Sequence, residues 1–375
     1  MHGIYIHIPF CAQKCSYCDF LSFPGAHQAQ KAAYVDALEK EMRLRLHGRW
    51  QEAQTIFIGG GTPTVLSAEA LAHLLAVLGR LVDLSQVQEF TVEANPGTVD
   101  AEKLAVLREG GVNRLSFGVQ SFDDALLRVL GRVHTAEEAE EAVALARAAG
   151  FKNVNLDLMY GLPGQTERQW RATLAQAIAL APQHLSLYQL IPEAGTAIVR
   201  QMDAGALPPV DEDGAAEWFD AQRGWLAEAG YQQYEISNYA QPGYASQHNQ
   251  LYWRLDDYLG LGLGATSWER PLRSTNTGDL SQYLYALASG QLPPRQEEQL
   301  TLAEQMSESV FMALRMNEGL SLARFQALYG VPLEEVFSEA LEEGISRGWL
   351  ALSERQLRLT DNGRRLGNWV FELFL

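Results

Sequence analysis

The chain has 375 residues, which is enough for two or three domains or for one barrel with an addition. Its 47% hydrophobic and 20% charged residues are typical of a globular protein. Acidic residues outnumber basic ones 46 to 29, and the net charge of −17 argues against nucleic acid as a partner because phosphate binding requires Lys and Arg. No apolar run reaches about 18 residues, and residues 3–10 lack a basic flank and a cleavage site, so we expect a cytoplasmic protein without a transmembrane segment or signal peptide.

Short apolar segments alternate with helical patterns through the first half of the chain. We expect strands at residues 4–8, 56–58, 90–93, 114–119, 154–159 and 185–191. The helices between them include one at residues 28–46, one that Ser67 opens and one that Asp100 caps. This alternation is typical of parallel βα units. Six units are fewer than the eight of a closed barrel, so the sequence predicts an α/β fold with a partial, open (β/α)6 barrel over residues 1–230.

All three cysteines of the chain lie in one segment, Cys11-Ala-Gln-Lys-Cys15-Ser-Tyr-Cys18. Inert core cysteines would be scattered along the chain, and a disulfide framework would need an even number and an oxidising compartment. Structural zinc would need a fourth ligand, and His7 and Asp19 do not lie at a suitable spacing. Thiolates are the usual ligands of iron–sulfur clusters. We therefore expect a [4Fe–4S] cluster with one iron left free for a further ligand.

Further polar residues and glycines fall where the predicted strands end, which is where barrels of this kind collect their functional groups. They are Gly59-Gly60-Gly61, Glu93, Gln120 and Asp157. Three glycines can also be only a tight turn, and Gln120 and Arg132 can be surface residues. Glu93 and Asp157 lie in apolar runs, where a carboxylate is costly unless it is paired. They are therefore candidates for a functional site.

The segment 231–290, interpreted as an extension of the barrel, contains the run His248-Asn249-Gln250-Leu251-Tyr252-Trp253. A neutral imidazole can ligate heme iron, and the two aromatic side chains offer flat apolar faces with polar edges that suit a porphyrin. The alternative is that this run is a loop packed on the barrel.

Residues 295–375 are expected to form a separate C-terminal domain after the linker-like segment 290–294. Helices are predicted near residues 303–316, 321–329 and 333–347, followed by a hairpin of residues 350–352 and 357–360 and a last helix after residues 361–363. This small α+β order resembles a winged helix, but its acidic excess argues against DNA. We expect a lid or a partner-docking unit. The apolar end at residues 369–375 is predicted to pack on this domain, with peripheral membrane or partner contact as the alternative.

The motifs together resemble the oxygen-independent coproporphyrinogen III oxidase family of radical S-adenosylmethionine (SAM) proteins. The resemblance spans residues 1 to about 270 and rests, in order, on Tyr5-Ile-His-Ile-Pro-Phe-Cys11-x3-Cys15-x-Tyr17-Cys18, Gly59-Gly-Gly-Thr-Pro-Thr64, Glu93-Ala-Asn-Pro96, Gly118-Val-Gln-Ser121 and Asp157-Leu-Met-Tyr-Gly-Leu-Pro163.

Within that family the chain resembles the heme-chaperone branch more than the dehydrogenase branch. In the dehydrogenases a fourth cysteine follows the third after one residue, and here that position is Phe20. The dehydrogenases also carry an N-terminal extension, whereas a strand already begins at Ile4 here. The run from His248 to Trp253 matches the HNxxYW motif associated with heme in the chaperone branch.

The resemblance implies specific roles for the motif residues. Cys11, Cys15 and Cys18 would hold the cluster, Tyr5 would pack near it, and Gly60 and Gly61 would present backbone to SAM. The resemblance also places the remaining motif residues at cofactors. At SAM, of which such enzymes can bind a second molecule, it places Tyr17, Thr62, Glu93, Gln120, Arg132 and Asp157. At heme it places His248, Asn249, Tyr252 and Trp253.

The function that the resemblance favours is a heme chaperone that carries a [4Fe–4S] cluster, SAM and heme and delivers heme to apo-hemoproteins of the respiratory chain. One rival is coproporphyrinogen III dehydrogenase, which removes the carboxyl groups of two propionates. Another is an unrelated radical SAM oxidoreductase.

Overall fold

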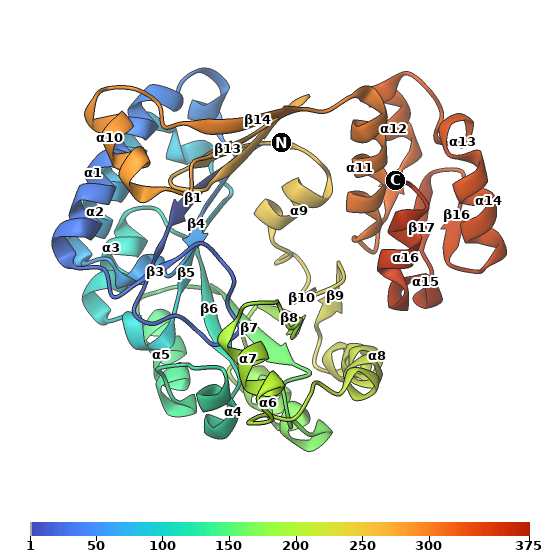
Figure 1. Ribbon diagram of the computed structural model, residues 1–375, viewed down its shortest axis with the longest axis horizontal. Coiled ribbons are helices and arrows are strands. Elements are labelled where there is room, and N and C mark those ends of the chain that lie inside the picture. Colours follow the sequence, from blue (N-terminus) through green and yellow to red (C-terminus); the bar gives the residue numbers. More distant parts are fainter. Residues whose placement is uncertain (1) are drawn as a thin grey trace.

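The computed structural model describes residues 2–375 and contains a twelve-stranded sheet at its centre (Figure 1). Six neighbouring strands of this sheet run parallel: β1 (His2–Ile8), β4 (Thr55–Gly60), β5 (Glu89–Ala94), β6 (Arg114–Gln120), β7 (Asn153–Tyr160) and β8 (His184–Gln189). All six predicted strands are therefore confirmed. Their side chains are mostly buried on both faces, as parallel strands covered by helices require.

Helices follow the strands and cover the outside of the sheet, as the βα rhythm predicts: α1 (Gln28–Arg45), α2 (Ala68–Leu81), α3 (Ala101–Glu109), α4 (Asp124–Val129), α5 (Ala136–Ala148) and α6 (Glu167–Ala179). The Ser67 hydroxyl accepts a hydrogen bond from the Ala70 amide, and the Asp100 carboxylate accepts one from the Lys103 amide. Both predicted N-caps are confirmed, and each fixes where its helix begins.

The barrel is open, because the sheet continues beyond the parallel strands at both edges instead of closing. Beyond β8 lie two antiparallel strands, β10 (Asn238–Ala240) and β9 (Gln232–Gln233). Beyond β1 lies a parallel strand, β11 (Asp257–Leu261), followed by antiparallel β12 (Thr266–Glu269), β13 (Leu272–Asn276) and β14 (Arg295–Gln299). The remaining helices of this part are α7 (Ala197–Asp203), α8 (Glu212–Glu228), α9 (Gln247–Trp253) and α10 (Leu280–Ala288).

The chain from α11 onward forms a second unit with its own apolar core. Its helices are α11 (Leu302–Leu314), α12 (Leu322–Tyr329), α13 (Leu333–Val336), α14 (Ser338–Ser346), α15 (Asp361–Arg365) and α16 (Gly367–Glu372). They pack with a small sheet in the order β15 (Leu320–Ser321), β17 (Gln356–Leu359) and β16 (Leu350–Leu352). The predicted hairpin is β16 and β17, and this unit lies to one side of the barrel in Figure 1.

Three details of the C-terminal part differ from the sequence expectation. The sequence places residues 295–299 in the C-terminal domain, but they form β14, pair with β13 and lie in the large sheet. The helix expected at residues 333–347 is two helices, because the backbone of Phe337 leaves the helical conformation. The last helix is also divided, into α15 and α16.

The apolar end of the chain packs partly on the C-terminal unit. Val370 and Phe374 are buried in its core, whereas Trp369 and Leu375 are exposed. Among residues 2–375, no helix combines the length and apolar character needed to cross a membrane.

Candidate functional site

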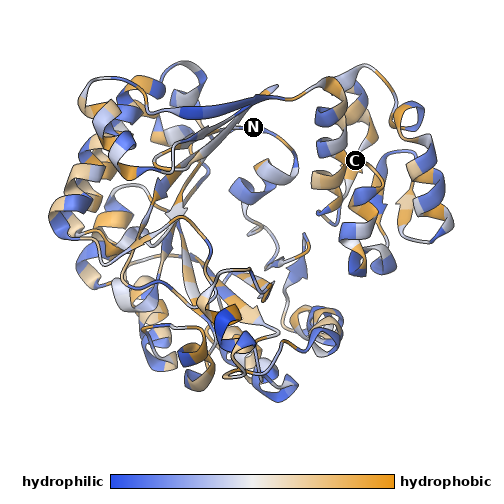
Figure 2. Ribbon diagram, in the orientation of Figure 1, coloured by the Kyte–Doolittle hydropathy of each residue, from blue (hydrophilic) through white to orange (hydrophobic). Residues whose placement is uncertain are grey.

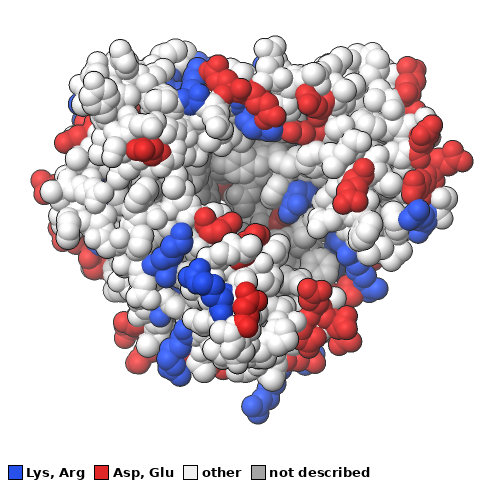
Figure 3. All heavy atoms as spheres, in the orientation of Figure 1, with Lys and Arg blue, Asp and Glu red and all other residues white. Residues whose placement is uncertain are grey.

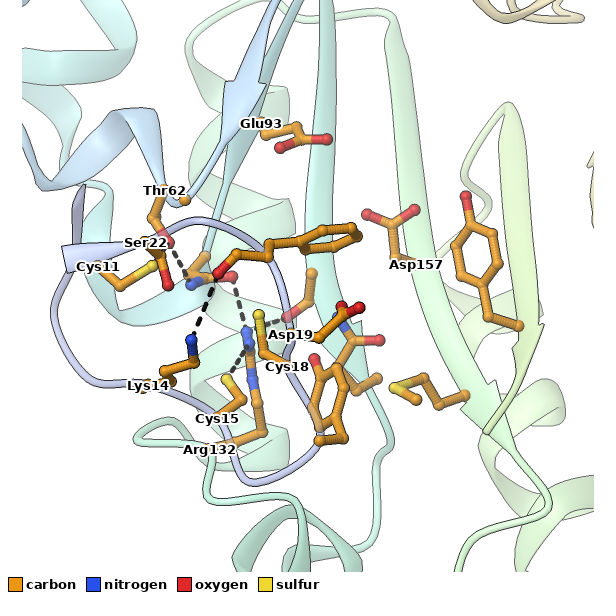
Figure 4. Close-up of a pocket in the computed structure, with 18 of the residues that line it drawn as sticks. Cys11, Lys14, Cys15, Cys18, Asp19, Ser22, Thr62, Glu93, Arg132 and Asp157 are labelled. Carbon is orange, nitrogen blue, oxygen red and sulfur yellow. Dashed lines mark hydrogen bonds between the residues drawn. The ribbon is translucent and has the colours of Figure 1, made fainter. Parts of the chain in front are cut away.

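A cavity of about 430 Å³ opens at the carboxyl ends of the parallel strands (Figure 4). Eleven residues that the sequence singled out line this cavity: Cys11, Cys15, Tyr17, Cys18, Gly60, Gly61, Thr62, Glu93, Gln120, Arg132 and Asp157. They come from the cysteine loop and from the ends of β4, β5, β6 and β7, together with the segment after α4. The fold therefore brings together residues that lie up to 146 positions apart, from Cys11 to Asp157.

The cysteine loop is fixed at both ends and in its middle. Strand β2 (Phe10–Cys11) pairs with β3 (Phe23–Pro24) and closes the loop. The Ser16 amide and hydroxyl donate to the carbonyl groups of Leu130 and Val129 at 3.0 and 2.8 Å, which ties the loop to the end of α4. The three cysteines are free thiols that are partly exposed toward the cavity. Such a loop can present three sulfur atoms to a bound group.

The polar neighbours of the thiols come from other strands. The Arg132 guanidinium lies 3.3 Å from Cys15 Sγ, and the Thr62 hydroxyl lies 4.0 Å from Cys11 Sγ. Burial raises the pKa of the Cys11 and Cys18 thiols.

The glycine turn after β4 is required by the packing as well as by the cavity. Gly60 has a φ of +108°, and a Cβ there would lie 2.3 Å from the His7 ring. A Cβ on Gly61 would lie 2.5 Å from the Phe10 carbonyl oxygen. The simple turn explanation therefore holds, and the same turn also exposes backbone to the cavity.

Glu93 on β5 and Asp157 on β7 place two carboxyl groups at the cavity, beside the cysteine loop (Figure 4). Glu93 accepts a hydrogen bond from the Gly60 amide at 3.0 Å, and Asp157 accepts from Ser116 at 3.1 Å and Asn155 at 2.9 Å. Burial and the neighbouring Asp157 raise the pKa of Glu93 to about 7, and burial raises the pKa of Asp157. Two such groups attract a cationic ligand when they are ionised.

The side chain of Arg132 reaches the end of β6, where Gln120 is the last residue. The Arg132 guanidinium donates to the Gly118 carbonyl and to Asn95 Oδ1, the latter at 2.7 Å, and Asn95 Nδ2 donates to the Thr62 hydroxyl at 2.9 Å. Gln120 follows a bulge in β6 and has a φ of +67°, a strained conformation typical of functional sites. Sequence reasoning did not assign Asn95 to the site, although its place two residues after Glu93 at a strand end is a usable signal.

Tyr5, unlike the other predicted neighbours of the cluster, does not line the cavity. Its hydroxyl lies 2.9 Å from His7 Nδ1, and its ring stacks on Phe57 inside the barrel at a centroid distance of 6.2 Å. It therefore forms part of the layer beneath the cavity.

The HNxxYW run forms α9 and lies at the opposite end of the barrel. His248 Nδ1 lies 2.8 Å from the hydroxyl of Thr55, the first residue of β4, whereas Gly60 at the other end of the same strand lines the cavity. Gly60 lies five positions after Thr55, which is roughly 17 Å at the usual rise of a strand. The structure therefore keeps the predicted heme motif apart from the cysteines.

His248 is not available to a metal in this arrangement. The side chain is fully buried, stacks on Phe57, and has its second nitrogen 2.9 Å from the Tyr252 hydroxyl. Burial lowers the pKa of its imidazole to about 3, so it is neutral. The structure therefore agrees with the alternative interpretation, in which this run packs on the barrel. Asn249, Tyr252 and Trp253 are partly buried on the same helix.

Comparisons with known proteins agree with this geometry. The model of the Radical SAM superfamily matches residues 5–177, and the model of the HemN C-terminal domain matches residues 300–366. The heme chaperone HemW of Bacillus subtilis is 41% identical over 100% of this chain and 99% of its own length, and that of Escherichia coli is 39% identical over 100% and 98%. This chain belongs to the HemW family of radical SAM proteins. The solved structure of the radical SAM coproporphyrinogen III oxidase HemN from Escherichia coli superposes with a TM-score of 0.85 at 25% identity, covering 100% of this chain and 89% of that chain.

Membership of the radical SAM superfamily implies a [4Fe–4S] cluster and SAM, and the residues present fit both groups. Three thiols of one loop face a cavity that also contains two partly buried carboxyl groups and an arginine. Among the described residues, no three His, Cys, Asp or Glu side chains converge closely enough to bind one metal ion. A cluster instead binds each thiolate at a separate iron atom, so its ligands need not converge on one point.

Proposed function

We propose that this protein is a heme chaperone, which binds heme and passes it to apo-hemoproteins of the respiratory chain. The observation that carries the proposal is the similarity, over the full length, to relatives named heme chaperones. A second support is Phe20, which is 66% exposed at the cavity and occupies the position where the family pattern of the dehydrogenases has a fourth cysteine.

We further propose that Cys11, Cys15 and Cys18 hold the cluster. A bound [4Fe–4S] cluster supplies single-electron chemistry, and the iron without a cysteine is free to bind SAM. Ser16 fixes the loop, and the Arg132 guanidinium lies 3.3 Å from Cys15 Sγ. The other cavity residues assigned to SAM lie beside the thiols on the neighbouring strand ends: Tyr17, Gly60, Gly61, Thr62, Glu93, Gln120 and Asp157.

The glutamate and aspartate suit the positive charge of SAM. Glu93 and Asp157 are partly buried at the cavity, where a carboxylate attracts a cation more strongly than it does in bulk water. The turn of Gly60 and Gly61 lines the cavity beside them and carries no side chains of its own.

For heme we propose α9 as the binding segment, with His248 as an iron ligand after α9 leaves the barrel. In the closed arrangement both imidazole nitrogens are hydrogen-bonded, so Thr55 and Tyr252 must release them first. Tyr252 and Trp253 then offer aromatic faces on the same helix. Heme binding is thus coupled to a movement of this helix.

The rival function is oxidative decarboxylation of coproporphyrinogen III, which the structural similarity to HemN favours. Two measurements on the purified, cluster-reconstituted protein separate the proposals: a hemin titration and an anaerobic assay with coproporphyrinogen III. The chaperone proposal predicts uptake of about one heme per chain and unchanged coproporphyrinogen III. Rapid conversion of coproporphyrinogen III to protoporphyrinogen IX would overturn it.

A further inference from the structure

Helix α9 is held against the amino ends of the barrel strands by buried contacts. The carboxylate of Glu89, the first residue of β5, accepts hydrogen bonds from the Ser246 hydroxyl at 3.0 Å and from the Gln247 and His248 amides at 2.8 and 3.0 Å. The Thr55 hydroxyl contacts the His248 ring on the same side. The barrel therefore fixes both the start of α9 and its histidine.

The C-terminal unit contacts the opposite side and the end of α9. Arg254, directly after the helix, pairs with Glu318 at 2.8 Å, and Asp256 pairs with Arg324 at 2.6 Å. Arg324 also donates to the Arg254 carbonyl at 2.8 Å. Figure 1 shows α9 between the barrel and the C-terminal unit. The helix can therefore leave the barrel only toward a side that the C-terminal unit occupies.

The junction between α9 and the C-terminal unit is polar and incompletely packed. The apolar cores of the barrel and of the C-terminal unit are separate clusters that share no residue. A cavity of about 330 Å³ lies between them, lined by Arg254 and Asp256 on one side and by Arg324 and Phe325 on the other. The face of the molecule in Figure 3 is hollowed at its centre, with acidic and basic side chains around the hollow. Polar interfaces of this kind separate more readily than continuous apolar cores.

A buried contact between an arginine and a tryptophan at the same junction also leaves polar atoms without hydrogen-bond partners. The Arg315 guanidinium lies 4.5 Å from the centre of the Trp253 ring, while the Trp253 Nε1 and Arg315 Nε atoms are buried and have no hydrogen-bond partner in the described residues. Such groups gain water when the junction opens, which offsets part of the lost contact.

We infer that the C-terminal unit gates the access of heme to α9, with the Arg254–Glu318 and Asp256–Arg324 pairs as its latch. The inference rests on the proposed heme function, because it concerns the regulation of that site. In the latched state α9 stays on the barrel and His248 stays buried. When the pairs separate, the part of the C-terminal unit beside α9 moves away and α9 can turn its histidine toward a ligand. Other contacts, such as those of Arg223 with Asp361 and of the Asn317 amide with the Tyr234 carbonyl, keep the unit attached to the barrel. The apparent affinity for heme is then the affinity of the open state multiplied by the open fraction.

The latch is weak enough to open at equilibrium. The side chains of Arg254 and Glu318 are 31% and 53% exposed, and those of Arg324 and Asp256 are 38% and 14% exposed. Partly exposed ion pairs stabilise a contact only modestly and are screened by salt. Removing both pairs is expected to increase the open fraction about tenfold.

The test compares the full-length wild type with the double variant Asp256→Asn and Glu318→Gln, which removes both pairs but keeps side-chain size. The matched control is Glu343→Gln, because Glu343 forms a similarly exposed pair with Arg347 at 2.7 Å at the end of α14. Hydrogen exchange of the α9 amides reports opening without heme, and stopped-flow absorbance reports hemin uptake. We expect both rates to rise about tenfold in the double variant and to stay unchanged in the control.

Charge reversal provides a rescue. Arg254→Glu alone should accelerate exchange and uptake, and combination with Glu318→Arg should restore slower rates because the pair is rebuilt in reverse. Unchanged α9 exchange in the double variant, or faster exchange with wild-type hemin uptake, would overturn the gate. Failure of the wild type to bind hemin would instead overturn the proposed function, which the exchange measurement distinguishes.

Discussion

Replacement of His248 by Ala tests whether α9 is docked as the structure shows. The wild-type ring is fully buried, contacts Thr55 and Tyr252 by hydrogen bonds of 2.8 and 2.9 Å, and stacks on Phe57 at 5.3 Å. The variant loses all of these contacts and leaves the Thr55 hydroxyl buried without its partner.

The expected loss in the free energy of opening α9 follows from those contacts. Each hydrogen bond contributes about 1 kcal/mol, and the aromatic contacts and the cavity left by the ring add a similar amount. We therefore expect the free energy of opening α9 to fall by about 2–4 kcal/mol, which corresponds to exchange about 30- to 1000-fold faster. Barrel amides near the cysteines should keep their protection, because His248 lies at the other end of the strands.

The assay is native-state hydrogen exchange on the cluster-reconstituted protein, analysed for the α9 amides. His73→Ala serves as the control, because the His73 side chain is 45% exposed on α2 and only pairs with Glu39. Wild-type protection of α9 in the His248 variant would refute the docking described above. Loss of the cluster in that variant would refute the separation of the two sites.

Three further predictions concern the cavity. Replacing any one of Cys11, Cys15 and Cys18 by Ala should abolish the reconstituted cluster in absorbance and iron analysis, and about four irons per chain in the triple variant would contradict this. Glu93→Ala and Asp157→Ala should each keep the cluster but lower the affinity for SAM in a binding titration. Loss of the cluster with unchanged SAM affinity would instead mean that these residues support the cluster and not SAM. Because the pKa of Glu93 is raised to about 7, its negative charge is present above that pH and lost below it. SAM affinity should therefore be about tenfold weaker at pH 6 than at pH 8, and Glu93→Gln should flatten the profile; an unchanged profile would exclude Glu93.

Much of the barrel could be predicted from the sequence because its signals are local. Each parallel strand is a short apolar run, and helix caps such as Ser67 and Asp100 act within three residues. The cavity residues could also be predicted, since parallel strands place their carboxyl ends at one edge. The assignment of residues 1–230 to the barrel and of residues 231–290 to its extension remains a proposal.

Elements that depend on distant partners could not be predicted. Strand β14 has the sequence Arg-Gln-Glu-Glu-Gln, is exposed throughout and appears hydrophilic in Figure 2, so only its pairing with β13 makes it a strand. The burial of His248 likewise depends on Thr55, which lies 193 residues away. A motif shows which chemistry a segment can perform, and only the fold shows whether its atoms are free.

The same limit applies to Glu89. Its carboxylate at the start of a strand carried no signal in the sequence, because the three groups that it accepts hydrogen bonds from lie 157 to 159 residues later. It is nevertheless only 4% exposed and fixes the start of α9. Long-range partners of this kind decide whether a binding motif is open or closed.

The most direct test of the proposed function is transfer of heme from the loaded protein to an apo-hemoprotein. The protein is loaded with hemin, freed of excess, and mixed with an apo-form of a b-type cytochrome while the Soret band of the acceptor is followed. The proposal predicts that the acceptor gains heme as this protein loses it, and that the latch variants transfer faster. Retention of the heme by this protein, with no acceptor spectrum formed, would contradict the proposal.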